Sequence, residues 1–141
     1  MNLKLCSSEA DLDVMLNIVK EQDVKEYDCT FEELCGVLKM VHRKNPNFRS
    51  WVLYENEIPI GFISAVYDGI LSLDVTITDF FIRKGYRGKG RIAMLVLAAK
   101  NWAEELDAKR VRWRTKIKRE TWERRLGGKL EEERIVTWVR R

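Results

Sequence analysis

Apolar residues recur at three- and four-residue spacing in three stretches of the chain, a period typical of amphipathic helices. The first stretch follows Ser8, which with Asp11 resembles a helix N-cap, and we expect this helix to end near Glu21. The second follows Thr30, which with Glu33 fits a capping box, and it ends before the next proline. The third stretch has the clearest pattern and comprises Ile92, Leu95, Val96, Ala99, Trp102, Ala103 and Leu106.

The segments outside these helices are rich in β-branched and aromatic residues, which favour strands. The expected strands cover residues 51–54, 58–66, 71–82, 109–118 and 129–139. The first two are joined by Glu55-Asn56-Glu57, a spacing that predicts an antiparallel hairpin. A short helix is expected over residues 121–126, ended by Gly127-Gly128.

The length of 141 residues fits one domain, so we expect residues 1–141 to share a single core. Apolar residues make up 45% and charged residues 34%, a globular composition. The longest nearly apolar stretch, Ile92 to Ala99, is far short of the roughly 18 residues of a membrane helix. The N-terminal residues also lack the pattern of a signal peptide, and we expect a soluble cytoplasmic protein without membrane partners.

The net charge of +4 conceals an uneven distribution. Residues 1–82 hold 7 Lys/Arg and 14 Asp/Glu, a net charge of −7, whereas residues 83–141 hold 19 and 8, a net charge of +11. The basic part is expected to attract anions such as a phosphorylated ligand, nucleic acid or an acidic protein. The acidic part is expected to attract a cationic amine, and mutual neutralisation of the two parts is the simpler alternative.

Cysteine and histidine usage excludes several chemistries. Cys6, Cys29 and Cys35 are odd in number and have no CxxC spacing, so neither a disulfide framework nor a zinc ribbon is expected. The only histidine, His42, lies in a polar run near a helix end, where a surface or structural role is expected. We therefore expect no metal, and Cys29 and Cys35 are poor candidates for a nucleophile.

A glycine-rich basic segment stands between the strand ending at Ile82 and the third helix. Gly88 and Gly90 allow close approach of the backbone, and the unpaired N–H groups at the helix N-terminus favour a phosphate. The side chains of Arg87, Lys89 and Arg91 are expected to add positive charge. The segment Arg87-Gly88-Lys89-Gly90-Arg91-Ile92, after Phe80-Phe81-Ile82, resembles the Arg/Gln-x-x-Gly-x-Gly/Ala signature of GNAT superfamily N-acetyltransferases, with Ile92 where the family prefers glycine or alanine.

The order of the expected elements also resembles that of the GNAT family over nearly the whole chain. The resemblance implies an α/β fold with a mixed, mainly antiparallel sheet flanked by helices. It also implies acetyl-CoA as the acyl donor, with its pyrophosphate on the amides of residues 88–92 and its pantetheine arm and acetyl carbonyl near Phe81 and Ile82. The acceptor is an amine, on a small molecule or a protein, which attacks the thioester directly in a ternary complex.

Candidate proton-transfer residues follow from the same chemistry, because an attacking amine must lose a proton. Asp79 lies just upstream of the motif and is the most plausible direct or water-mediated base. The alternative is that Asp79 is solvated or forms a salt bridge, as acidic residues on strands more often do. Many family members place a tyrosine acid four residues before the glycine turn after their last helix. Here that position is Glu123, which is a weaker candidate for proton transfer than Asp79. Tyr86 and Tyr67 are further candidates for the acid.

Two other interpretations fit parts of the sequence. Residues 88–93 satisfy a dinucleotide-binding Gly-x-Gly-x-x-Ala pattern, but the rest of the chain is too short for the remaining strand–helix units. Along the strand expected at 109–118, alternate basic residues share one face: Arg110, Arg112, Arg114, Lys116 and Lys118. In a noncatalytic family member, this ladder could bind nucleic acid or an acidic protein. It could equally bind the 3'-phosphate of CoA. The simplest alternative is cross-strand pairing with Glu131, Glu132 and Glu133 of the final strand. Trp113, on the opposite face, is expected in the core.

Overall fold

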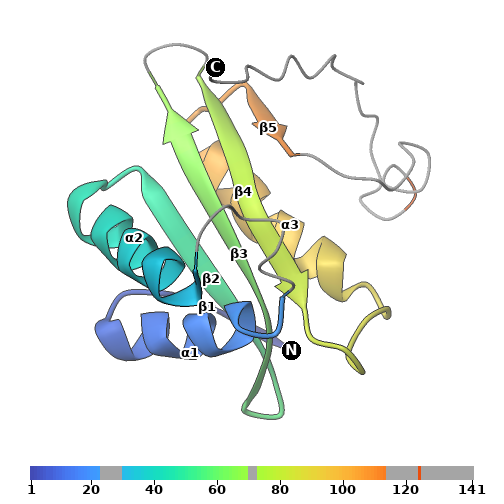
Figure 1. Ribbon diagram of the computed structural model, residues 1–141. Coiled ribbons are helices and arrows are strands. Elements are labelled where there is room, and N and C mark those ends of the chain that lie inside the picture. Colours follow the sequence, from blue (N-terminus) through green and yellow to red (C-terminus); the bar gives the residue numbers. More distant parts are fainter. Residues whose placement is uncertain (23–29, 70–72, 114–123, 125–141) are drawn as a thin grey trace, which may run out of the picture.

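The computed structural model describes residues 1–22, 30–69, 73–113 and 124 of the chain. Along the sequence its elements are β1 (Asn2–Leu5), α1 (Glu9–Val19), α2 (Phe31–Lys44), β2 (Phe48–Glu55), β3 (Ile58–Asp68), β4 (Asp74–Ile82), α3 (Arg91–Glu105) and β5 (Arg110–Arg112). One sheet runs through the centre and helices cover both of its faces (Figure 1). This arrangement confirms the α/β class expected from the sequence.

The sheet contains five strands in the order β1-β2-β3-β4-β5. The first three pairings are antiparallel, and β4 and β5 are parallel, so the sheet is mixed and mainly antiparallel as expected. Two residues, Asn56 and Glu57, separate β2 from β3, and both have positive φ angles, as a tight hairpin turn requires. The helix α3 makes the crossover that a parallel pair needs, and thereby places its N-terminus beyond the end of β4.

Local capping sets where the first two helices begin. The side-chain oxygen of Ser8 accepts a hydrogen bond from the Asp11 amide at 3.2 Å, which caps α1. In α2, Thr30 accepts from the Glu33 amide at 3.2 Å while Glu33 accepts from the Thr30 amide at 3.4 Å. This reciprocal pair confirms the capping box expected from the sequence.

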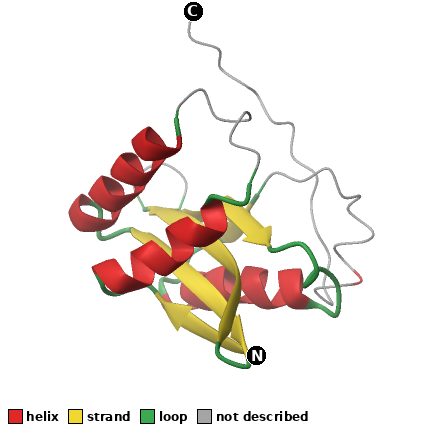
Figure 2. Cartoon of the chain, turned by 60° about the horizontal axis from the view of Figure 1, so that its bottom comes forward, coloured by secondary structure: helices red, strands yellow, loops and turns green. Residues whose placement is uncertain are grey.

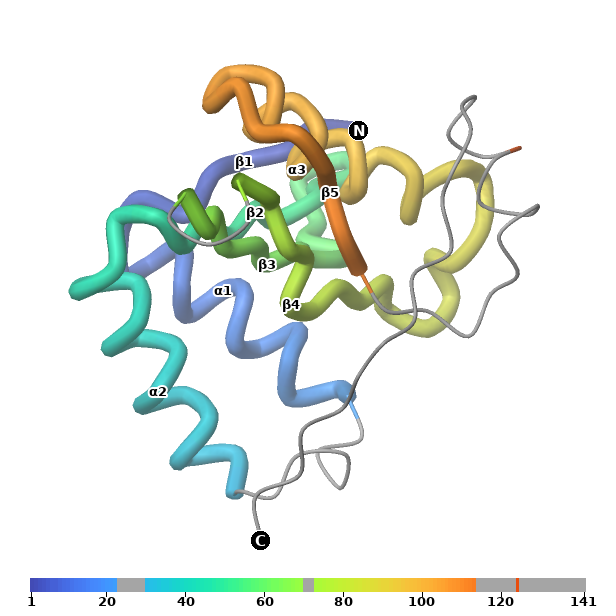
Figure 3. The backbone as a smooth tube through the Cα atoms, turned by 90° about the horizontal axis from the view of Figure 1, so that it is seen from above, coloured from blue at the N-terminus to red at the C-terminus, as the bar shows by residue number. Residues whose placement is uncertain are grey.

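The helices pack on opposite faces of the sheet, as Figures 2 and 3 show, with α1 and α2 on one face and α3 on the other. The face under α3 holds the larger core, in which Trp102 meets Trp51 edge to face at 5.8 Å between ring centroids. On the other face, Met15 of α1 packs against Val52 and Phe62. The two cores fix the sheet from both sides and make β3, its central strand, the most buried strand.

The structure differs from the sequence-based expectations at both ends. The strand β1 was not expected, because four mostly exposed residues at a sheet edge carry too short a pattern to recognise. The strand expected at 109–118 is observed as β5 over Arg110–Arg112, without Lys109 and Trp113, and residues 114–118 lie outside the described residues. The short helix expected at 121–126 and the β segment at 129–139 also lie outside the described part, apart from Arg124.

Candidate functional site

The turn between β4 and α3 has a left-handed backbone at three consecutive residues. Gly88, Lys89 and Gly90 have φ angles of 97°, 54° and 73°, a left-handed run that glycine adopts readily. Gly90 is the N-cap of α3 and provides no side chain to cap the helix. Among the described residues, no heavy atom beyond the immediate neighbours lies within 4 Å of where a Cβ would stand on Gly88 or Gly90. The helix end is therefore open toward this turn.

Backbone donors converge at this open end. The Arg91 amide donates to the Gly88 carbonyl at 3.2 Å, and the first full helical bond of α3 runs from the Met94 amide to the Gly90 carbonyl at 3.1 Å. The amides of Ile92 and Ala93 precede that bond, so the helix itself provides them with no acceptor. These N–H groups lie at the N-terminus of α3, which is the positive end of the helix dipole and stabilises an anion.

Two basic side chains flank the turn. Arg87 and Lys89 are both exposed. Arg87 lies over the ring of Phe81 at 5.4 Å, and its Nε donates to the Ile82 carbonyl at 3.2 Å. This contact ties the turn to the end of β4 and leaves the rest of the guanidinium for an anion.

Arg91 departs from the sequence-based expectation, because its charge faces the protein. Its Nε and Nη2 donate to the two carboxylate oxygens of Glu55 at 2.8 and 2.9 Å, and its Nη1 donates to the Tyr86 carbonyl at 2.6 Å. The Arg91 side chain is only 8% exposed. Arg91 therefore fixes the turn against the β2–β3 hairpin, and no pattern around Glu55 in the sequence indicated this partner.

A β-bulge in β4 determines which residues face α1. Ser64 of β3 pairs with Asp79, but its neighbour Ala65 pairs with Ile77, so Thr78 is an extra residue. The Thr78 hydroxyl donates to the Ser64 carbonyl at 3.2 Å. An extra residue reverses the facing of the side chains beyond it.

The reversal distributes the motif residues between the two faces of the sheet. Phe81 joins the core on the α1 side, whereas Ile82 is buried under α3. Asp79 also faces α1, where its Oδ1 accepts a hydrogen bond from Nε2 of Gln22 at 3.3 Å. No pattern in the sequence indicated Gln22 as this partner, because Gln22 lies 57 positions away from Asp79 along the chain. Glu123, the other proton-transfer candidate, lies outside the described residues.

The edge of β4 next to the turn is open within the described part of the chain. There β5 pairs only with Asp74, Val75 and Thr76. The second half of β4, from Ile77 to Ile82, therefore has β3 on one side and no described strand on the other.

The two described members of the basic ladder contact a buried acid. Asp74 is fully buried, and its carboxylate lies 3.1 Å from Arg110 Nε and 3.5 Å from Arg112 Nη1. Pairing with Asp74 on the neighbouring strand therefore gives Arg110 and Arg112 a structural role that does not require nucleic acid. The other three basic residues and the glutamates of the final strand lie outside the described residues. Trp113 packs against the core under α3, as expected.

His42 has the structural role expected from the sequence. Its Nε2 lies 2.8 Å from the Ser50 hydroxyl, which lies 2.6 Å from the Ser64 hydroxyl, so α2 is joined to β2 and β3. Burial lowers the pKa of His42. The thiol of Cys6 is also half-buried, and burial raises its pKa to about 12, which makes it a poor nucleophile.

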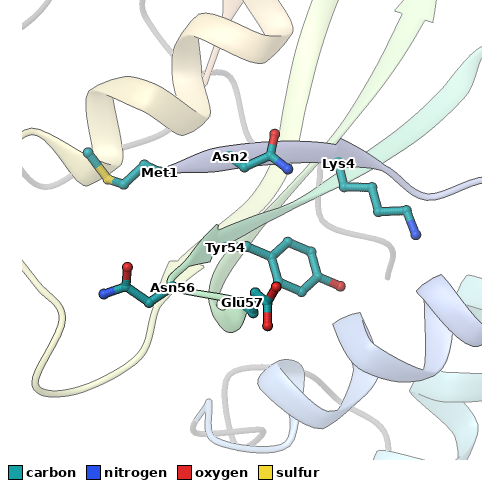
Figure 4. Close-up of a pocket in the computed structure, with 6 residues that line it drawn as sticks. All are labelled: Met1, Asn2, Lys4, Tyr54, Asn56 and Glu57. Atoms are coloured by element: carbon teal, nitrogen blue, oxygen red, sulfur yellow. The ribbon is translucent and has the colours of Figure 1, made fainter.

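A surface pocket of about 410 Å³ lies at the opposite edge of the sheet from β5, between β1 and the β2–β3 turn (Figure 4). Its lining residues are Met1, Asn2, Lys4, Tyr54, Asn56 and Glu57, and none belongs to the glycine-rich turn. Among the described residues, no cluster of three His, Cys, Asp or Glu side chains is arranged to hold a metal ion, and no helix is long and apolar enough to cross a membrane.

Known structures share the fold over almost the whole chain. An aminoglycoside antibiotic 6'-N-acetyltransferase AAC(6')-IG from Acinetobacter haemolyticus is 16% identical with a TM-score of 0.74, covering 100% of this chain and 99% of its own. Aminoglycoside N-acetyltransferase AAC(6')-Iy in complex with CoA is 15% identical with a TM-score of 0.76, over 99% and 94%. A predicted acetyltransferase from Clostridium acetobutylicum with acetyl-CoA is 16% identical with a TM-score of 0.73, over 98% and 95%.

The sequence itself also matches a known family. No curated protein matches the chain. Residues 12–127, however, match the Acetyltransferase (GNAT) family, and this range contains the glycine-rich turn, the bulged strand and α3. The chain therefore belongs to the GNAT acetyltransferase family.

Proposed function

We propose that residues 1–141 form one catalytic domain that transfers an acetyl group from acetyl-CoA to an amine. The observation that carries the proposal is the open N-terminus of α3, with its left-handed turn at Gly88, Lys89 and Gly90. Such a turn presents backbone amides to a pyrophosphate, and Arg87 and Lys89 add exposed positive charge on either side of Gly88. Complexes of related folds with CoA and acetyl-CoA support the same ligand.

The half of β4 next to the glycine-rich turn has no strand beside β3 among the described residues, and this supports a path for the rest of the ligand. An extended pantetheine arm has amide groups that can pair with the edge of a strand, as a short extra strand would. We infer that backbone groups of Phe81 and Ile82 hold this arm and the acetyl carbonyl. Because the bulge at Thr78 puts Asp79 and Phe81 on the α1 side, the acetyl end of the ligand would lie next to the Asp79 carboxylate.

When bound, acetyl-CoA supplies an activated thioester carbonyl carbon. Asp79 then has a defined task, because the amine must be neutral to attack and must lose a second proton as the new C–N bond forms. We propose that the Asp79 carboxylate receives this proton directly or through one water, with Glu123 as a second candidate. The C–S bond of the thioester breaks as the amide forms, and CoA leaves as a thiolate that takes a proton from the protonated carboxyl group or from solvent. Attack occurs in a ternary complex, so the chain itself forms no covalent bond to the acetyl group. The described thiols support this route, since Cys6 has a raised pKa.

The acceptor that we propose is a primary amine on a small molecule or a protein. The aminoglycoside acetyltransferases among the similar structures support a small polyamine as one candidate. We further propose a cytoplasmic location, where acetyl-CoA is made and where Cys6 and Cys35 would remain thiols.

A thermal-shift titration tests the donor assignment. Acetyl-CoA is expected to raise the melting temperature, because a ligand that binds only the folded state stabilises it, whereas NADH is expected to have no effect. Gly90→Glu places a carboxylate at the expected pyrophosphate position and is expected to abolish the acetyl-CoA response. No response of the wild-type protein to any CoA species would refute the proposal.

Transfer of labelled acetyl groups tests the activity itself. Purified protein, labelled acetyl-CoA and a panel of amines that includes benzylamine, putrescine and a lysine-containing peptide are expected to give an acetylated amine. Whole-cell protein serves as a second acceptor pool. Label that stays in acetyl-CoA with every acceptor, despite a thermal response to acetyl-CoA, would indicate a binding protein and not an enzyme.

A further inference from the structure

The side chain of Gln22 lies beside the candidate base. Gln22 follows α1, and its amide donates to the Val19 carbonyl at 3.0 Å, so its backbone continues the last turn of that helix. Its Nε2 donates to Oδ1 of Asp79 across to β4, at 3.3 Å. The residue after this helix end therefore contacts the Asp79 carboxylate on the α1 side of the sheet, the side that Asp79 faces because of the bulge at Thr78.

The other end of the same amide has no partner. Oε1 of Gln22 is buried and accepts no hydrogen bond in the described part of the chain. Buried carbonyl oxygens nearly always have a donor, and one left without a donor is destabilising. Rotating the amide to satisfy Oε1 would bring an oxygen against the Asp79 carboxylate, so the hydrogen bond to Asp79 fixes the orientation.

The residue before Gln22, Glu21, forms an ion pair with Arg83. Arg83, which follows β4, donates its Nε to both carboxylate oxygens of Glu21 at 3.0 Å and its Nη1 to the Pro59 carbonyl at 3.2 Å. Glu21 precedes Gln22, so the same helix end holds Arg83 in place and presents a carbonyl oxygen next to Asp79. The resulting pair of acceptors, a carboxylate and an amide oxygen, fits a ligand with several N–H donors on one atom.

We propose that Gln22 is a specificity-determining residue for the acceptor, an inference that rests on the acetyltransferase activity proposed above. Its Nε2 positions the Asp79 carboxylate, and its Oε1 accepts one N–H of the incoming primary amine while Asp79 receives another. A primary ammonium has three N–H donors and a neutral primary amine has two, so either form can donate one hydrogen bond to Gln22 Oε1 and one to the Asp79 carboxylate. A tertiary amine has none in its neutral form and is excluded.

Steady-state kinetics of Gln22→Met test this role, because methionine keeps the length of the side chain and removes both polar atoms. With the best acceptor among benzylamine, putrescine and a lysine-containing peptide, the amine KM is expected to rise about 10- to 100-fold, as for loss of a hydrogen bond to a charged group. The KM for acetyl-CoA and its thermal shift are expected to stay unchanged, because the phosphate turn lies on another segment. Asn17→Met, on an exposed position of α1, is the matched control and is expected to change neither.

Gln22→Glu separates recognition from positioning. Glutamate keeps an acceptor for the amine but loses the donor to Asp79, so the amine KM is expected to stay within about threefold of wild type while kcat falls. An unchanged amine KM in an active Gln22→Met protein would overturn the inference and leave the proposed function intact. A wild-type protein that acetylates no amine would overturn both, and its response to acetyl-CoA would show whether only catalysis is absent.

Discussion

Replacing Glu55 by glutamine removes one charge from the ion pair between Glu55 and Arg91, which fixes the glycine-rich turn. Arg91 donates to both oxygens of Glu55 and is 8% exposed, whereas Glu55 is 29% exposed. Glutamine offers one oxygen in place of two and leaves the guanidinium without a counter-charge. The rest of the environment, including the hydrogen bond from Arg91 Nη1 to the Tyr86 carbonyl, stays in place.

The magnitude follows from the burial of the two partners. Breaking a fully buried ion pair destabilises a protein by about 3–5 kcal/mol, and an exposed pair contributes about 0–1 kcal/mol. Because Arg91 is nearly buried and Glu55 is partly hydrated, we expect Glu55→Gln to lower the free energy of unfolding by about 2 kcal/mol. For a chain of this length, that corresponds to a fall in melting temperature of roughly 6–10 °C.

Urea unfolding followed by tryptophan fluorescence measures the effect, because Trp51 and Trp102 pack together in the core next to α3. Glu57→Gln is the matched control, since it removes the same charge from an exposed residue of the same hairpin. In a double-mutant cycle, Glu55→Gln and Arg91→Gln together are expected to cost clearly less than the sum of the two single changes. Equal stability of the Glu55→Gln and Glu57→Gln proteins would refute the reasoning.

Three further predictions address the proposed base, the N-terminal helix and the half-buried His42. Asp79→Asn is expected to lower kcat by about 10²–10⁴-fold with the acetyl-CoA thermal shift unchanged, and near-normal kcat would exclude Asp79 as the base. Lys4 and the Ser7 amide hold the pKa of Asp11 well below its usual range, so stability present above about pH 4 is expected to fall at lower pH. Asp11→Asn should flatten that acid limb in urea titrations. Burial lowers the pKa of His42, so its contribution is present above about pH 6.5 and lost as the pH falls further, and His42→Gln should remove this part of the pH dependence.

The helices and the central hairpin were predictable from local signals. Thr30 and Glu33 fix the start of α2 through bonds between residues three apart, and these leave a direct trace in the sequence. The turn at Gly88 and Gly90 was equally visible, because only certain residues adopt a left-handed backbone readily. Such features depend on neighbours along the chain, and a pattern of residue types captures them.

Features that depend on distant partners were not predictable. The bulge at Thr78 changes which face Asp79 occupies, but a strand with one extra residue has no distinct composition. The partners of Arg91 and Asp79, which are Glu55 and Gln22, are 36 and 57 positions away. Only the folded sheet brings these pairs together, so the sequence indicated the conformation of the glycine-rich turn but not the residues that support the turn or contact Asp79.

Binding of acetyl-CoA to Gly90→Asp and Gly90→Asn proteins tests most directly whether the pyrophosphate lies at the glycine-rich turn. Aspartate and asparagine have nearly the same shape, and both tolerate a left-handed backbone, so the two variants differ in one negative charge at the N-cap of α3. If the pyrophosphate lies on the amides of this turn, titration calorimetry should give a Kd for acetyl-CoA at least about tenfold weaker for Gly90→Asp than for Gly90→Asn. Equal Kd values for the two proteins would contradict the placement of acetyl-CoA at this helix end.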